Sequence, residues 1–171
     1  LPIRDISGHN AGIAFADYDN DGDRDIFIAH GSVARGTAGR DILLRNDRGI
    51  FTDVSLEAGF TDSLISAFAI WLDYNADRLL DLYVGHGDIP GNNDQSNFLY
   101  RNNGDGTFTN VTRDTGLDIF FNDTSTDLFG HSPGTTTSAI STDFNSDNWQ
   151  DLYVAVPGGE NRLLLNDGRG H

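Results

Sequence analysis

The sequence of 171 residues predicts an all-β protein made of three repeats, each a four-stranded antiparallel sheet. Two observations predict this fold. An acidic motif occurs three times, beginning at Asp17, Asp73 and Asp143, which lie 56 and 70 residues apart. Short segments rich in Ile, Val, Phe, Tyr and Thr flank the motifs and are bounded by turn residues, which is typical of strands. Repeats of this length with four strands are typical of β-propeller blades.

Each repeat has the same order of strands. The first strand ends at the acidic motif, and the second begins directly after it. The third strand carries Leu43–Asn46, Leu99–Asn102 or Leu163–Asn166 and leads into a turn that contains glycine. Asn, Asp and Gly tolerate the positive φ of tight hairpin turns. A fourth strand is expected at Phe51–Ser55 and at Phe108–Thr112, whereas no matching segment follows the third turn.

We expect one domain over residues 1–171, with repeat units at approximately 8–55, 56–112 and 113–171. The segment Ile3–Ser7 matches the fourth-strand pattern, so residues 1–7 are expected to form the outer strand of a neighbouring or closing blade. Three blades leave open sheet edges. The repeats are therefore expected to belong to a larger propeller, or to one that is completed by oligomerisation.

Composition excludes several classes of function. The 26 acidic and 11 basic residues give a net charge of −15 at pH 7, which argues against nucleic acid as a partner. No stretch approaches about 18 consecutive apolar residues, so no transmembrane segment is expected. Cysteine is absent, which excludes thiol catalysis, disulfides and thiolate zinc sites.

The acidic motifs predict Ca²⁺ sites. Each reads Asp-Xaa-Asp/Asn-Xaa-Asp-Xaa-Xaa-Xaa-Asp, with side-chain oxygens at positions 1, 3, 5 and 9. Ca²⁺ takes about six to eight oxygen ligands, and a backbone carbonyl at position 7 is expected to add one. We predict up to three ions, one per repeat. The predicted ligands are Asp17, Asp19, Asp21, Asp25 and the carbonyl of Asp23; Asp73, Asn75, Asp77, Asp81 and the carbonyl of Leu79; and Asp143, Asn145, Asp147, Asp151 and the carbonyl of Trp149.

The alternative is that the loops are acidic surface turns without an ion. Three motifs in register, each followed by the same apolar strand pattern, favour the metal. The loops are not EF-hands, because position 12 is Ile28, Val84 or Val154 rather than glutamate. We expect the first loop to bind most tightly and the second most weakly. Position 6 needs a sharp backbone turn, which Gly22 supplies easily and Arg78 does not.

The three motifs, together with Tyr100–Thr112 and Glu57–Phe60, resemble the FG-GAP/VCBS repeats, which are calcium-loop propeller blades also found in integrin alpha subunits. The resemblance extends over nearly the whole chain. It implies a β-propeller of extracellular or exported proteins, whether secreted, at the cell surface or periplasmic. It also implies that calcium is structural and that protein or glycan ligands bind elsewhere on the propeller.

Other residues suggest weaker hypotheses. The connection 113–136 is 13 residues longer than the matching connection 56–66. Its residues Phe120, Phe121 and Phe129 are expected either to recognise a ligand or to cap a blade. His30 and His86 occupy equivalent positions in different repeats, where structural roles are expected.

The predicted function is a non-catalytic calcium-binding module for extracellular recognition, adhesion or assembly. Its expected partners are a protein or glycan ligand outside the cytoplasm, and the rest of the propeller or additional copies of the chain. The sequence has no nucleophile elbow, and its glycine-rich segments lie in hairpins rather than before helices, so an enzyme is not expected. The alternatives are the propeller portion of an extracellular enzyme, such as a polysaccharide lyase, and a carbohydrate-binding lectin.

Overall fold

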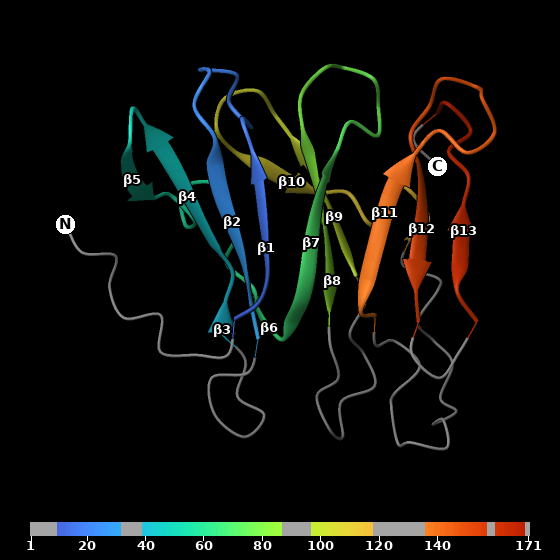
Figure 1. Cartoon of the computed structure of the whole chain (residues 1–171), viewed down its shortest axis with the longest axis horizontal. Helices are drawn as coiled ribbons and strands as arrows, with labels where there is room; N and C mark the ends of the chain where they lie inside the picture. The colour runs from blue at the N-terminus through green and yellow to red at the C-terminus, as the bar shows by residue number, and fades with distance from the viewer. Residues whose placement is uncertain (1–9, 32–38, 87–96, 118–135, 157–159, 170–171) are drawn as a thin grey trace.

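The computed structural model describes residues 10–31, 39–86, 97–117, 136–156 and 160–169. Three antiparallel sheets stand side by side in chain order, and no α-helix occurs in the described residues (Figure 1). The predicted all-β class with antiparallel sheets is confirmed. The described sheets do not close into a ring. Residues 1–7 and Phe120, Phe121 and Phe129, which carried predictions, lie outside the described residues.

The first two sheets have four strands each, as the repeats predict. In the first sheet the spatial order is β1 (Asn10–Ala16), β2 (Asp25–His30), β4 (Ile42–Asp47) and β5 (Ile50–Asp53). In the second sheet the order is β7 (Ser66–Leu72), β8 (Asp81–His86), β9 (Phe98–Asn102) and β10 (Phe108–Asn110).

The third sheet has three strands in the described part of the chain: β11 (Ser138–Thr142), β12 (Asp151–Ala155) and β13 (Arg162–Leu164). A small two-stranded sheet joins β3 (Gly39–Arg40) to β6 (Ser63–Leu64). The described residues contain no helix that is long and apolar enough to cross a bilayer.

The three large sheets share one register. The last aspartate of each acidic motif begins the second strand and pairs with the last residue of the first strand, at Ala16↔Asp25, Leu72↔Asp81 and Thr142↔Asp151. Equivalent positions can therefore be compared from sheet to sheet.

The two cores lie between neighbouring sheets, because successive side chains on a strand point to opposite faces. On β8, Leu82 and Val84 contribute to the core shared with the first sheet, whereas Tyr83 contributes to the core shared with the third. Aromatic rings fill the first core, where Tyr18 stacks on Trp71 with ring centroids 6.1 Å apart. Each inner sheet face thus depends on the next sheet for its burial.

Candidate metal centre

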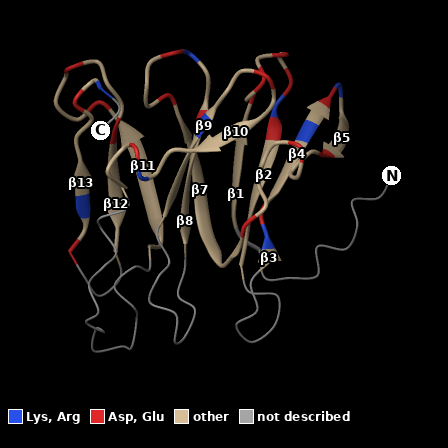
Figure 2. Cartoon of the chain, turned by 180° about the vertical axis from the view of Figure 1, so that it is seen from behind, with Lys and Arg blue, Asp and Glu red and all other residues tan. Residues whose placement is uncertain are grey.

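The acidic motifs form the loops between the first and second strands of each large sheet. All three loops lie at the same edge of the row of sheets, where Figure 2 shows acidic residues gathered in the turns. This arrangement follows from the shared register. It leaves each loop in a separate sheet, so each candidate site is built from one motif.

In the first loop, the side chains of Asp17, Asp19 and Asp21 converge. They each offer a carboxylate oxygen, and these oxygens all lie within 4.8 Å of one another. Backbone N–H groups hold the carboxylates in place: Asp21 N donates to Asp17 Oδ1 at 3.0 Å, and Gly22 N donates to Asp17 Oδ2 at 3.0 Å. The cluster offers hard oxygen ligands, the type that Ca²⁺ and Mg²⁺ prefer.

The second and third loops repeat these backbone hydrogen bonds. Asp73 accepts from Asp77 N at 3.1 Å and from Arg78 N at 2.9 Å. Asp143 accepts from Asp147 N at 3.1 Å and from Asn148 N at 2.8 Å. The three loops therefore have one common backbone conformation, although their side chains differ.

Two positions of each loop have positive φ. At position 6, φ is 95° for Gly22, 71° for Arg78 and 73° for Asn148, which agrees with the predicted sharp turn. At position 4, φ is 60° for Asn20, 56° for Ala76 and 64° for Ser146, a feature that the sequence did not predict. Left-handed backbone is unfavourable for residues with a Cβ, so the second loop, with Ala76 and Arg78, is the most strained.

The asparagine at position 3 changes the second and third loops. Asn75 Nδ2 donates to Asp77 Oδ2 at 2.8 Å, and Asn145 Nδ2 donates to Asp147 Oδ2 at 2.8 Å. These amides already bind a carboxylate oxygen that a cation would use. Among the described residues, three carboxylates gather this closely only in the first loop.

The aspartate at position 9 has a structural role. Asp25 is fully buried, and its two oxygens accept from Tyr18 N at 3.1 Å and from Asn46 N at 2.8 Å. Asp81 and Asp151 make the same pair of bonds, to the N–H groups of Tyr74 and Asn102 and of Phe144 and Asn166. The carboxylate thus ties the start of the loop to the third strand. The remaining lone pairs of this carboxylate are available to coordinate a cation.

Burial and hydrogen bonding shift the pKa values of several of these carboxyl groups. Burial raises the pKa of Asp81 to about 7, and it also raises the pKa of Asp25 and Asp19. In the third loop, the N–H of Asn148 lowers the pKa of Asp143. A carboxyl must lose its proton before it coordinates a metal, so the second loop has the least favourable charge state near neutral pH.

Position 7 carries the predicted carbonyl ligands of Asp23, Leu79 and Trp149. Each of these residues donates its N–H to the aspartate at position 5, at 2.8 to 2.9 Å. The side chain of Asp23 accepts from Arg48 N at 2.8 Å, which links the first loop to the following hairpin. The carbonyls themselves stay predicted ligands.

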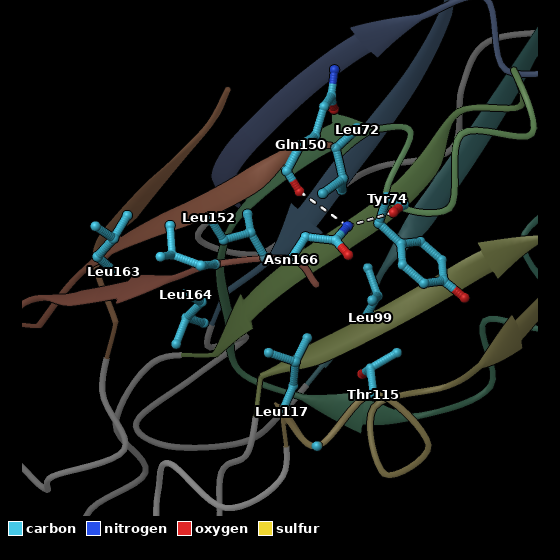
Figure 3. Close-up of a pocket in the computed structure, with 12 residues that line it drawn as sticks. Leu72, Tyr74, Leu99, Thr115, Leu117, Gln150, Leu152, Leu163, Leu164 and Asn166 are labelled. Carbon is cyan, nitrogen blue, oxygen red and sulfur yellow. Dashed lines mark hydrogen bonds between the residues drawn. The ribbon is translucent and has the colours of Figure 1, made fainter. Parts of the chain in front are cut away.

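The sequence pattern placed an asparagine at or near the end of each third strand, at Asn46, Asn102 and Asn166, but did not predict its role. Asn102 Nδ2 donates to the carbonyl of Tyr18 at 2.9 Å, and Asn166 Nδ2 donates to the carbonyl of Tyr74 at 2.6 Å. Each bond joins one sheet to the acidic loop of the preceding sheet. Figure 3 shows Asn166 between Tyr74 and Gln150. The recurrence of this asparagine in all three repeats was the available signal.

A second recurring hydrogen bond, from a strand-end N–H to a polar side chain, was also not predicted from the sequence. Asp41, Asn97 and Asn161 accept from the N–H of His30, His86 and Val156, at 2.8, 2.9 and 3.1 Å. Burial raises the pKa of Asp41 to about 6. His30 and His86 are themselves buried at strand ends in different sheets.

An apolar groove of about 460 Å³ lies between the second and third sheets (Figure 3). Its lining includes Tyr74, Leu117 and Leu164. Between the first two sheets, Phe108 of the fourth strand β10 occupies the matching place, with its ring 5.6 Å from that of Tyr18. The groove therefore lies where the described third sheet lacks a fourth strand.

Comparison of the sequence with models of known protein families found no match. Comparison with curated proteins found no relative either. The geometry of the loops and the repeat pattern are therefore the basis for a proposed function.

Proposed function

We propose that the chain is a non-catalytic, calcium-stabilised module whose three large sheets are blades of a β-propeller. Side-by-side antiparallel sheets in one register, with a core between each pair, are consistent with successive blades. The resemblance of the motifs to FG-GAP/VCBS repeats supports the same conclusion. A complete ring requires further blades.

The observation that carries the proposal is the convergence of Asp17, Asp19 and Asp21, with oxygens within 4.8 Å of one another. Like charges at this separation repel, and a divalent cation converts the repulsion into attraction. The N–H groups of Asp21 and Gly22 orient Asp17 and leave it further lone pairs for a cation. Oxygen-only ligands favour Ca²⁺ or Mg²⁺ over softer metals.

The loops should bind calcium with different affinities. The first has three converging carboxylates, whereas the other two replace one of them with an amide that donates to its neighbour. The second has in addition the strained Arg78 and a pKa of about 7 at Asp81. The proposed order is therefore the first loop tightest and the second weakest.

Calcium has a structural role in this proposal. An ion that binds the folded loops and not the unfolded chain adds its binding free energy to stability. Three ions would change the formal charge from −15 to −9. We assign the module to recognition, adhesion or assembly outside the cytoplasm, with a protein or glycan ligand bound away from the loops, because the resembling repeats have this role.

Isothermal titration of Ca²⁺ into the chelator-stripped full chain, with Mg²⁺ as a parallel titrant, tests the metal sites. The variant Asp21→Asn keeps an acceptor for Asp23 N but removes a carboxylate, so it should lose the tightest site. The matched control is Asp105→Asn, in an exposed hairpin turn outside the motifs, which should bind like the unmodified chain. Absence of calcium binding, or equal binding by both variants, would contradict the proposal.

A further inference from the structure

Two side chains of the third sheet join the second acidic loop to the third. Gln150, at position 8 of the third motif, accepts with Oε1 a hydrogen bond from the N–H of Asp73 at 3.0 Å. Asn166 Nδ2 donates to the carbonyl of Tyr74 at 2.6 Å and to the carbonyl of Gln150 at 3.3 Å (Figure 3). Asp73 and Tyr74 are the first two residues of the second motif. The third sheet therefore holds the second loop at its first predicted ligand.

Only one of these two connections joins the first loop to the second. Asn102 Nδ2 donates to the carbonyl of Tyr18 at 2.9 Å and to the carbonyl of Leu80 at 3.2 Å, as Asn166 does one sheet later. Position 8 of the second motif is Leu80, whose side chain has no hydrogen-bond acceptor. The chain thus contains its own comparison, with the asparagine connection at both junctions and the glutamine connection at one.

The place of Gln150 in its motif relates it to an ion in the third loop. Its two neighbours in the chain, Trp149 and Asp151, supply the predicted carbonyl and carboxylate ligands at positions 7 and 9. An ion that fixes both neighbours restricts Gln150, whose Oε1 also accepts from Ser141 Oγ at 3.3 Å. A restricted Gln150 in turn restricts the backbone of Asp73. The second loop then loses less conformational freedom when it binds its own ion.

We propose that cation binding in the third loop strengthens cation binding in the second loop, through Gln150 and Asn166. The proposal rests on the proposed function and deepens it by assigning regulation to the same sites. The coupling is reciprocal, because each ion changes the affinity of the other loop by the same factor. Its benefit falls on the second loop, the one with the strained Arg78. The third loop therefore fills before the second and prepares it.

Nuclear magnetic resonance of the chelator-stripped full chain, titrated with Ca²⁺, reads the three loops separately. The N–H groups of Gly22, Arg78 and Asn148 each donate to the first aspartate of their own loop, so their signals report its occupancy. The variant Asp147→Asn removes a carboxylate from the third loop and keeps an acceptor for Trp149 N. We expect it to weaken calcium binding at the second loop about fivefold, the lower end of the usual range for coupled sites.

The variant Gln150→Leu tests the path of the coupling. It introduces the residue found at the equivalent position 80, and the Gln150 side chain is exposed, so circular dichroism should show an unchanged fold. In the Gln150→Leu chain, Asp147→Asn should weaken the second loop less than it does in the unmodified chain, because only the Asn166 connection remains.

The matched control is Asp21→Asn, which removes one carboxylate from the other neighbour of the second loop. The glutamine connection is lacking at that junction, so this variant should change the second loop less than Asp147→Asn does. Equal effects of the two variants would overturn the proposal, since they would indicate long-range charge rather than the hydrogen bonds.

Two further results would also overturn the proposal. One is an unchanged or increased affinity of the second loop in Asp147→Asn, and the other is an effect of Asp147→Asn that is the same with and without Gln150. Both leave the metal sites themselves in place. The absence of a calcium-dependent shift at all three amides is a different result, because it contradicts the proposed function together with the coupling.

Discussion

Replacing Arg78 by glycine should stabilise the second acidic loop. Arg78 has φ of 71°, a left-handed conformation that disfavours residues with a Cβ by about 1–2 kcal/mol. Glycine removes this strain but loses about 0.5–1 kcal/mol through its greater freedom in the unfolded chain. The Arg78 side chain is exposed, and the N–H that donates to Asp73 at 2.9 Å is retained. We expect a net gain of about 0.5–1 kcal/mol in the free energy of unfolding.

Urea unfolding in excess chelator measures this gain without calcium. The control is Arg78→Gln, which removes the same charge but keeps the Cβ, so it should leave stability in chelator unchanged. The reciprocal test is Gly22→Ala in the first loop. A Cβ at Gly22 meets no atom within 4 Å, so the expected loss of about 1 kcal/mol would come from the backbone alone. Equal stability of the Arg78→Gly and Arg78→Gln variants would refute the assignment of strain to this position.

Three further changes test separate parts of the structure. Asp25→Ala leaves two backbone N–H groups unpaired and should lose about 2–4 kcal/mol even in chelator, measured by urea unfolding; a loss seen only with calcium would contradict the structural role. Burial raises the pKa of Asp41 from 3.8 to about 6, so the folded chain holds this proton longer than the unfolded chain, and stability should fall as pH rises from about 4 to 6. Asp41→Asn, which introduces the residue type found at the equivalent position 97, should remove that slope, and an unchanged pH profile would disprove the assignment. Gly85→Ala places a Cβ against the buried ring of Phe68 and should lower the free energy of unfolding by about 1–3 kcal/mol; an unchanged melting temperature would contradict this packing.

The strands could be predicted because their signals are local. The acidic motif, the apolar segment after it and the glycine-containing hairpin turn all lie within one repeat, and each specifies its own turn or strand. The sharp backbone at position 6 could be predicted for the same reason, because Gly22 marks it in the first loop. The positive φ at Ala76 was not predicted, because alanine is not a residue type that indicates a left-handed backbone.

The connections between sheets could not be predicted because their partners lie far apart in the chain. Asn102 meets the carbonyl of Tyr18 across 84 residues, and a backbone acceptor has no sequence signature. Asp25 was counted only as a metal ligand, since spacing reveals the motif but not burial. Its burial and its two backbone N–H partners require the folded sheet.

Thermal unfolding of the full chain in excess chelator, in millimolar Ca²⁺ and in millimolar Mg²⁺ tests the central claim most directly. If the acidic loops are structural calcium sites, the melting temperature should rise strongly in Ca²⁺ and much less in Mg²⁺, because Mg²⁺ demands a stricter octahedral geometry. The rise should shrink in the Asp21→Asn variant. Equal melting temperatures in chelator and in Ca²⁺ would contradict the claim and leave the loops as acidic turns.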